Sequence, residues 1–362
     1  MSKTIAILTG GGDCPGLNAV IRGVVRSAMQ KKWRVLGVED GFDGLISNSP
    51  VRELDSVTVR GILQRGGTIL GTSNHGDPLN YPVEKNGQIE RVDMSQVVIE
   101  NFNRLGADAL IAVGGDGTLK IAQHLYQLGL NVVGIPKTID NDLKSTDVTF
   151  GYNTAVGVVT EALDRLHTTA ESHHRVMVVE VMGRDAGWIA LESGIAGGAD
   201  VILLPEIPYS IEHVCNAINE RREGGGRFSI VVVAEGAFPQ QGEKVVKVGT
   251  GLSRSGVERL GGIGQYVAEQ LADCTEMEVR TVVLGHLQRG GSPSPFDRIL
   301  GSRFGVKAVD LIDQGQFGKM VSLRGRNVVA TTIADAVGSL NTVDPQGELV
   351  KAAEKLGIML GR

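Results

Sequence analysis

Short apolar runs rich in β-branched residues alternate along the chain with longer stretches that carry apolar residues at helical spacing. The short runs predict buried strands at 4–9, 109–113, 131–135, 175–181, 200–205, 228–236 and 280–285. The longer stretches predict helices at 119–128, 153–171, 211–222 and 253–272. Strands that alternate with helices indicate βαβ units and a mostly parallel sheet, and their continuous apolar character indicates helices on both faces.

Polar, glycine-rich segments directly follow six of the predicted strands. These segments are 10–18, 114–118, 136–142, 182–187, 235–236 and 285–291. In open parallel sheets, ligands bind beyond the carboxyl ends of the strands. Glycine and aspartate are common in ordinary turns, so one such segment would mean little, but six of them favour a functional site.

Composition narrows the class of protein. The 362 residues suggest two domains, with a boundary near residue 150 where a loop gives way to a helix. A formal net charge of -5 offers no basic surface for nucleic acid or an anionic membrane. The longest apolar runs, such as 229–234, are too short to span a bilayer, and no apolar leader is apparent near the amino terminus.

Glycine and cysteine usage add two further expectations. The 50 glycines indicate many turns and close approaches of the backbone. The three cysteines, Cys14, Cys215 and Cys274, lie far apart without a CxxC spacing. Neither a disulfide framework nor a zinc site is therefore expected, and a reducing cytosol is the default location.

Two glycine loops have the residues that phosphate binding requires. Gly10, Gly11 and Gly12 lie between a strand and a helix, where backbone amides and the helix dipole can hold phosphate oxygens. The loop at 114–118 adds a carboxylate and a hydroxyl, which suit Mg²⁺ and phosphate, although it is not a Walker A loop. A tight turn and a capped turn are the structural alternatives for these two loops.

The segment PKTIDND at 136–142 combines two carboxylates with a lysine and a threonine. Asp140 and Asp142 could divide proton acceptance and support of a metal between them. Lys137 and Thr138 could hydrogen-bond the transferring oxygens. A solvated turn is the alternative, but it does not account for a lysine placed beside the acids.

Basic residues also recur at the ends of the predicted strands. They are Arg175, Arg184, Arg280, His286 and Arg289. Arginine suits bidentate recognition of phosphate. The residues therefore indicate a kinase-like enzyme with one cluster for a phosphoryl donor and Mg²⁺ and another for an acceptor that itself carries a phosphate.

Taken together, the motifs resemble the 6-phosphofructokinase family from about residue 3 to about residue 310. The segments that carry the resemblance are GGDCPGLNAVIRG, GGDGT, PKTIDND, VEVMGRDAGW, AEG and VLGHLQRGGSPSPFDR. The resemblance implies an α/β fold of two doubly wound, mostly parallel-sheet (Rossmann-like) domains with the active site in the cleft between them. It assigns residues 1–150 and roughly 288–340 to a domain for the donor and Mg²⁺, and residues 151–287 and roughly 341–362 to a domain for fructose 6-phosphate.

The resemblance also implies a reaction and its partners. A nucleotide, most simply ATP, would phosphorylate the 1-hydroxyl of fructose 6-phosphate in cytoplasmic glycolysis. Mg²⁺ would be the cofactor, and the protein would be a homo-oligomer, a tetramer or a dimer, with shared active sites. Arg175 and Arg280 match arginines that reach in from a neighbouring subunit.

Site residues are implied by the same resemblance. The catalytic set would be Asp140, Thr138 and Arg184, with Asp140 as the base. The donor set would be Gly12, Gly115, Asp116, Gly117, Thr118, Asn74 and Lys137, and the metal residues would be Asp116 and Asp142. The fructose 6-phosphate set would be Thr138, Ile139, Asp140, Arg175, Met182, Gly183, Arg184, Glu235, Arg280, His286, Leu287, Gln288 and Arg289. Arg22 and Arg26 match an effector site.

Several positions depart from the pattern of bacterial ATP-dependent members. Lys137 replaces a glycine, as in the pyrophosphate-dependent branch and in some ATP-dependent relatives, and Asn74 replaces an arginine that commonly contacts the nucleotide. Gly117 favours a nucleotide donor instead, because pyrophosphate-dependent members carry Asp at that position. ATP is thus the expected donor, with ADP or pyrophosphate as alternatives, and a non-catalytic sensor of sugar phosphate or nucleotide is a second class of function.

Overall fold

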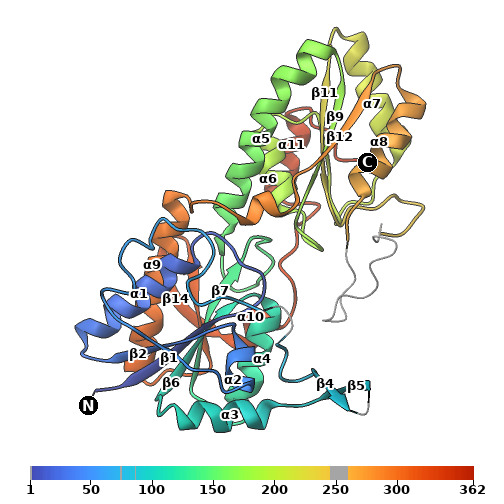
Figure 1. The fold of residues 1–362 in the computed structure, drawn as a ribbon. Helices are drawn as coiled ribbons and strands as arrows, with labels where there is room; N and C mark the ends of the chain where they lie inside the picture. The colour runs from blue at the N-terminus through green and yellow to red at the C-terminus, as the bar shows by residue number, and fades with distance from the viewer. Residues whose placement is uncertain (1, 74–75, 86, 245–259) are drawn as a thin grey trace. The chain divides into compact units, whose positions relative to one another are not determined.

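The chain folds into two compact units, shown in Figure 1. The computed structural model describes residues 2–73, 76–85, 87–244 and 260–362. The first unit comprises Met1–Thr138, Leu143–Asn153 and Arg289–Leu340, and the second comprises Ile139–Asp142, Thr154–Gln288 and Asn341–Arg362. Each unit is therefore assembled from segments that lie far apart in the sequence.

The first unit is built around an eight-stranded sheet. Its strands are β1 (Thr4–Thr9), β2 (Arg34–Val38), β3 (Arg52–Leu54), β6 (Ala109–Gly114), β7 (Val132–Thr138), β8 (Phe150–Gly151), β13 (Lys319–Arg324) and β14 (Asn327–Thr332). The order is β14-β13-β7-β6-β1-β2-β3, with β8 paired to β7. All pairs are parallel except β2 with β3 and β13 with β14. A separate antiparallel pair is formed by β4 (Tyr81–Lys85) and β5 (Gln88–Val92).

Helices cover both faces of this sheet (Figure 1). They are α1 (Leu17–Gln30), α2 (Phe42–Ile46), α3 (Ser95–Arg104), α4 (Asp116–Gln127), α9 (Pro295–Asp313) and α10 (Ile333–Val337). α1 packs against α9, and the buried side chains of α2, α3, α4 and α10 form one core with alternate residues of β1 and β6. Burial of both faces explains why the strands are continuously apolar.

The second unit contains a smaller, wholly parallel sheet. Its strands are β9 (Val176–Val181), β10 (Val201–Leu203), β11 (Ser229–Ala234) and β12 (Val279–Val283), in the order β10-β11-β9-β12. Its helices are α5 (Tyr152–His173), α6 (Trp188–Ala196), α7 (Ile211–Glu223), α8 (Ile263–Cys274) and α11 (Glu348–Lys355), with a 3₁₀ helix η1 at Gly285–Arg289. Side chains of α7 and α8 share a core with β9, β10 and β11.

The predicted α/β class is confirmed, and the predicted strands are present with shifted ends. The strand expected at 131–135 is longer, because β7 continues through Lys137 and Thr138, which are therefore strand residues. The helix expected at 253–272 falls partly outside the described residues, and α8 begins at Ile263. The strand pattern did not reveal β2, β13 or β14, which lie toward the edges of the first sheet.

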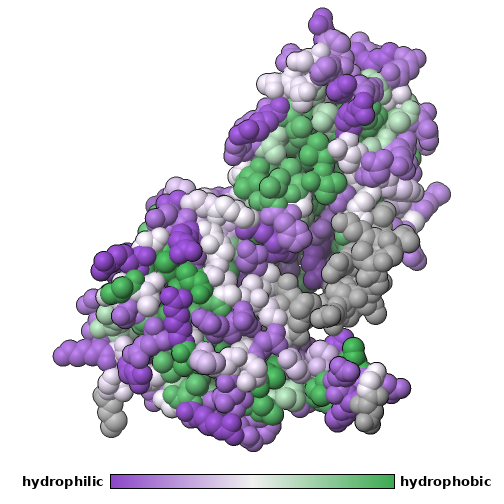
Figure 2. Space-filling model, viewed as in Figure 1, coloured by the Kyte–Doolittle hydropathy of each residue, from purple (hydrophilic) through white to green (hydrophobic). Residues whose placement is uncertain are grey.

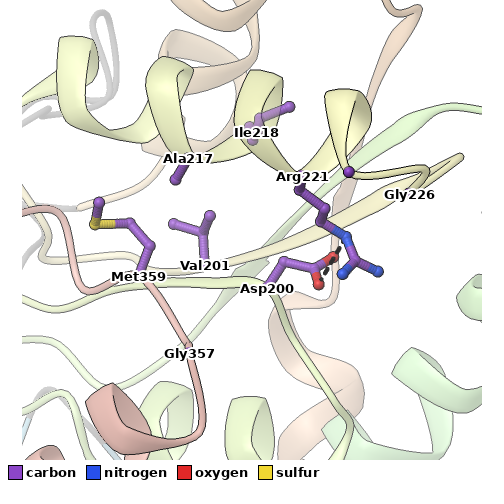
Figure 3. A pocket seen from close by; sticks show the side chains of 9 residues that line it. Asp200, Val201, Ala217, Ile218, Arg221, Gly226, Gly357 and Met359 are labelled. Carbon is purple, nitrogen blue, oxygen red and sulfur yellow. Dashed lines mark ion pairs between the residues drawn. The ribbon is translucent and has the colours of Figure 1, made fainter.

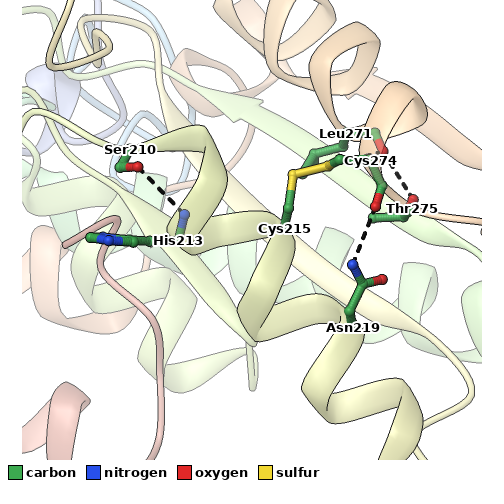
Figure 4. The surroundings of a disulfide bond; sticks show 7 residues. All are labelled: Ser210, His213, Cys215, Asn219, Leu271, Cys274 and Thr275. Atoms are coloured by element: carbon green, nitrogen blue, oxygen red, sulfur yellow. Dashed lines mark hydrogen bonds between the residues drawn. A yellow bond between two sulfur atoms is a disulfide. The ribbon is translucent and has the colours of Figure 1, made fainter.

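The expectation that the cysteines do not pair is wrong. Cys215 of α7 and Cys274 at the end of α8 form a disulfide with a Cα–Cα distance of 6.1 Å (Figure 4). The two residues are 59 positions apart in the sequence, and only the packing of α7 beside α8 brings them together. Asn219, one turn further along α7, donates a hydrogen bond to the carbonyl of Cys274 at 3.2 Å.

The surface view in Figure 2 shows hydrophilic residues over much of both units. Hydrophobic residues gather on the visible face of the second unit in the region of α6 and α11. Leu356, which directly follows α11, is among the exposed large side chains. In the described ranges, none of the helices combines the length and the apolar composition that a membrane span requires.

A buried carboxylate joins the central strand β9 to the start of α8. Glu180 is 4% exposed, and its side chain accepts hydrogen bonds from the backbone N–H groups of Gly262 at 3.0 Å and Gly264 at 2.9 Å. The first N–H groups of a helix have no partner within the helix. Glu180 therefore satisfies donors that would otherwise be buried without an acceptor.

We expect Glu180→Ala to lower the free energy of unfolding by about 2–4 kcal/mol, because each buried donor left without a partner costs about 1–3 kcal/mol. Glu180→Gln keeps an acceptor oxygen and should cost less. Urea denaturation measures both. The exposed Glu223→Ala at the end of α7 is the matched control and should change the free energy by less than about 0.5 kcal/mol. Equal effects of the two alanine variants would contradict the capping role.

Candidate functional site

Two glycine loops meet at the carboxyl ends of adjacent strands in the first unit. β1 and β6 are parallel neighbours, and the backbone N–H of Gly10 donates to the carbonyl of Val113 at 2.9 Å. The side chain of Thr118 lies against the first loop, so that a Cβ atom at Gly10 would come within 2.7 Å of its hydroxyl. The predicted phosphate loops at 10–12 and 114–118 are thus neighbours.

Two cationic side chains lie against the first of these loops. The amine of Lys137, which is 3% exposed, donates a hydrogen bond to the carbonyl of Gly12. Arg289 donates to the carbonyl of Asp13 at 3.1 Å, and a Cβ atom at Gly12 would lie only 2.7 Å from its guanidinium. The absence of a side chain at Gly12 allows this close approach. The loop therefore has two positive charges in contact with it, which favours an anionic ligand.

The second loop presents a carboxylate beside open space. Asp116 is the first residue of α4, its side chain is 26% exposed, and it forms an ion pair of 2.6 Å with Lys120 one turn further on. Gly117 has no heavy atom within 4 Å of the position that a Cβ would occupy. A side chain at position 117 would therefore not collide with the protein. It would occupy the open space beside the loop.

The free cysteine near these loops is not a candidate nucleophile. Cys14 is fully buried, and its thiol lies 3.7 Å from the carbonyl of Phe150. Burial raises the pKa of Cys14, an effect that the nearby Lys137 opposes only in part. The reactive form of cysteine is the thiolate, so this residue contributes packing.

The acid loop at 139–142 groups with the second unit. Asp140 is 6% exposed, and the Asn141 that follows it has a positive φ of 52°. Residues other than glycine adopt this left-handed conformation only where surrounding contacts hold it, although asparagine tolerates it better than most. The conformation turns the chain sharply between the two aspartates.

A second loop of this unit carries Arg184. Its backbone N–H donates to the carboxylate of Glu235 at 3.1 Å, and the N–H of Met182 donates to the side chain of Gln288 at 3.2 Å. These contacts join the ends of β9, β11 and β12, which are parallel neighbours. Met182, Gly183, Arg184, Glu235 and Gln288 are thus brought together, with His286 and Leu287 exposed on η1 beside them.

Arg175 and Arg280 lie at the opposite edge of the same sheet. Arg175 directly precedes β9, and Arg280 is the second residue of β12. Glu278 accepts hydrogen bonds from both, from Arg175 at 2.5 Å and from Arg280. The hydrogen bond from Arg175 holds the pKa of Glu278 below its ordinary value. The two arginines form a pair that a single carboxylate holds together.

A cavity of about 360 Å³ opens at this amino edge as well, near the start of β10 (Figure 3). Asp200 and Arg221 face each other in its wall, with 3.0 Å between carboxylate and guanidinium. Burial raises the pKa of Asp200, although the N–H of Ile230 and the charge of Arg221 favour its ionised form. None of the residues that the sequence proposed for the site lines this cavity.

The remaining predicted residues are placed as follows. Ile139 and Thr138 are buried, at the point where the chain passes from the first unit to the second. Arg22 and Arg26 lie one turn apart on α1. Asn74 lies outside the described residues.

Sequence reasoning missed two residues that contact the predicted site. Glu278 could have been noticed, since this acidic residue lies only two positions before Arg280 and directly precedes β12. Asn341 contacts the acid loop through hydrogen bonds of 2.8 Å, yet no pattern around it in the sequence indicates this.

Two α/β units with glycine loops, carboxylates and arginines at strand ends define a class of phosphate-handling enzymes, and the comparisons agree. The family model described as phosphofructokinase matches residues 4–312. The chain belongs to the phosphofructokinase family.

Relatives and solved structures are similar over nearly the whole chain. A Clostridium perfringens protein named ATP-dependent 6-phosphofructokinase 2 is 55% identical over 98% of this chain and 98% of its own length. A Streptomyces coelicolor protein named pyrophosphate–fructose 6-phosphate 1-phosphotransferase is 50% identical over 99% of each. The crystal structure of Pichia pastoris phosphofructokinase in the T-state is 32% identical with a TM-score of 0.80, and the match covers 99% of this chain but 37% of that one.

Proposed function

We propose that the protein transfers the γ-phosphoryl group of ATP to the 1-hydroxyl of fructose 6-phosphate, giving fructose 1,6-bisphosphate and ADP in glycolysis. The observation that carries this proposal is the meeting of two glycine loops beside buried Lys137 in the first unit, with open space at Gly117. Full-length similarity to a protein named ATP-dependent 6-phosphofructokinase 2 supports it. A non-catalytic sensor is disfavoured because Asp116, Asp140 and Asp142 are all present.

The first unit holds the donor in this proposal. The amides of Gly12 and of residues 115–118 bind phosphate oxygens, as backbone amides at strand-to-helix turns commonly do. Lys137 compensates charge on the phosphates, because its buried amine is already directed at Gly12. The relative named for pyrophosphate shows that similarity alone does not decide the donor, so the donor is argued from the chemistry of Gly117.

The second unit holds the sugar phosphate and the base. Asp140 accepts the proton of the 1-hydroxyl while that oxygen bonds to the γ-phosphorus and the bond to the β–γ bridging oxygen breaks. Thr138 and Arg184 stabilise the charge on the transferring group. Binding of fructose 6-phosphate is shared among the rest of the set. Those residues are Ile139, Met182, Gly183, Glu235, His286, Leu287 and Gln288 of the second unit, together with Arg289, which belongs to the first unit.

Mg²⁺ is the proposed cofactor, and the residues present suit it. Among the described residues, no group of three histidine, cysteine or acidic side chains is arranged to hold a metal by itself. Mg²⁺ is usually held by one or two carboxylates together with substrate phosphates and water, so this finding fits. Asp116 and Asp142 would supply the carboxylates, and the ion would neutralise charge on the phosphates.

Two sets of arginines on one sheet support a site shared between subunits. Arg184 follows the carboxyl end of β9, whereas Arg175 precedes its amino end. A strand of six residues separates such positions by about 20 Å. The two arginine positions therefore lie at opposite ends of the sheet, and we propose that Arg175 and Arg280 serve a neighbouring subunit in a homo-oligomer, a tetramer or a dimer. The exposed Phe296, Ile299 and Val306 on one face of α9 are consistent with association.

A cytoplasmic location and an effector site complete the proposal. Arg22 and Arg26, one turn apart on α1, are proposed for an effector that carries negative charge.

Asp140→Asn should lower kcat by about 10²–10⁴-fold, because the amide keeps the shape of the carboxylate but cannot accept the proton. KM for fructose 6-phosphate should change little. A coupled assay for ADP measures both constants. Asp164→Asn, on the exposed side of α5, is the matched control and should match the wild type. If Asp140→Asn retained more than half of the wild-type kcat, the base assignment would be wrong.

ATP should give a higher kcat/KM than pyrophosphate, ADP or GTP in a donor panel with Mg²⁺. Gly117→Asp should abolish use of ATP, because its carboxylate would occupy the space of the α-phosphate and repel it. Folding and fructose 6-phosphate binding should persist, since the position is open. Gly157→Asp is the matched control, because Gly157 is also helical and has no atom within 4 Å of a Cβ. A wild type that prefers pyrophosphate would overturn the donor proposal.

Arg280→Ala should raise KM for fructose 6-phosphate by about 10–150-fold, which corresponds to the loss of a charge-assisted contact of about 1.5–3 kcal/mol. Mixed oligomers of Arg280→Ala and Asp140→Asn should recover activity, since some sites then combine two intact parts. Arg222→Ala, an exposed arginine paired with Glu276, serves as the control. Confirmed mixed oligomers without recovery would argue against shared sites.

A further inference from the structure

The backbone of the acid loop is held by one residue from the carboxyl-terminal segment. Asn341 donates its backbone N–H to the carbonyl of Asp142 at 2.8 Å and its side-chain amide to the carbonyl of Asn141 at 2.8 Å. All three residues belong to the second unit. Two consecutive carbonyls of the loop are therefore fixed by a single residue, which lies 200 positions after Asn141 in the sequence.

The same segment is fastened to the loop that carries Arg184. The indole N–H of Trp188 donates to the carbonyl of Asn341 at 2.9 Å. The N–H groups of Val343 and Gly187 both donate to the carboxylate of Glu206, at 2.8 Å and 2.9 Å. Residues 341–343 thus connect the acid loop to the end of the 182–187 loop.

We propose that Asn341 is a positioning residue that orients Asp140 through the backbone of Asn141. This inference rests on the proposed role of Asp140 as the base. Asn141 adopts a left-handed conformation, which persists in a residue other than glycine where neighbouring contacts determine it. Catalytic groups must be held to within about half an ångström of their working geometry. The amide of Asn341 supplies such a restraint one residue away from Asp140.

The contacts of Asn341 separate a side-chain role from a backbone role. Any residue at this position can offer the N–H to Asp142 and the carbonyl to Trp188. Only an amide-bearing side chain of this length can donate to the carbonyl of Asn141. Asn341→Ala therefore removes one hydrogen bond and leaves the segment attached, and Asn341→Asp keeps the size but turns a donor into an acceptor.

The test compares kcat and KM of wild type, Asn341→Ala and Asn341→Asp with ATP and fructose 6-phosphate. Asn341→Ala should lower kcat about tenfold, as the loss of one ordinary hydrogen bond would, with both KM values within about twofold. Asn341→Asp should be slower still, because its carboxylate faces a carbonyl.

A second asparagine of this unit provides the control. Asn219 makes the same kind of bond, from its side-chain amide to the carbonyl of Cys274, elsewhere in the second unit, so Asn219→Ala should leave kcat unchanged. In a Trp33→Phe background, the emission of Trp188 should stay the same in Asn341→Ala, which shows that the segment remains attached. An Asn341→Asp variant with wild-type kcat would mean that the residue only fills space, and it would overturn the inference.

Failure of the inference is separable from failure of the proposed function. If the wild type is active and the Asn341 variants have the same kcat, the positioning role is refuted and the proposed function is not. Effects confined to KM refute it too. A wild type that is inactive with every nucleotide and with pyrophosphate refutes the proposed function, and the inference falls with it.

Discussion

Parallel pairing of strands is the constraint on which every candidate site in this protein depends. β1, β6 and β7 pair in parallel in the first unit, and β9, β11 and β12 do so in the second. In the strands that are buried on both faces, apolar side chains fix the register, because a shift would break the packing with helices on either side. Strands that all point one way bring segments from distant parts of the sequence to a common edge.

Polar groups that are buried near these edges connect separate segments through hydrogen bonds. An unpaired charge in the interior is costly, so each such group requires a partner. Lys137 donates to the carbonyl of Gly12, and Glu180 accepts from the start of α8. The same contacts that satisfy these groups also set the positions of the loops. Stability and the arrangement of the site are therefore not independent in this protein.

The opposite edge of the second sheet has a different role. Arg175 and Arg280 are held there by Glu278, one strand length away from Arg184. A single chain thus carries arginines at both ends of one sheet, and this placement is the reason for proposing a site shared between two copies. The hydrogen bond from Asn341 shows that the acid loop also depends on a segment beyond residue 312, where the match to the family model ends.

The sequence by itself determined the α/β class, most strands of the two sheets and the glycine and acid loops that follow them. These features are local: a continuous apolar run predicts a strand, and a glycine cluster predicts a turn, whatever the rest of the chain does. Only the tertiary structure decided that Cys215 meets Cys274, that Glu278 lies between two arginines and that Asn341 holds the acid loop. Such contacts join residues far apart in the chain, and the packing of helices against sheets sets them, which no local pattern records.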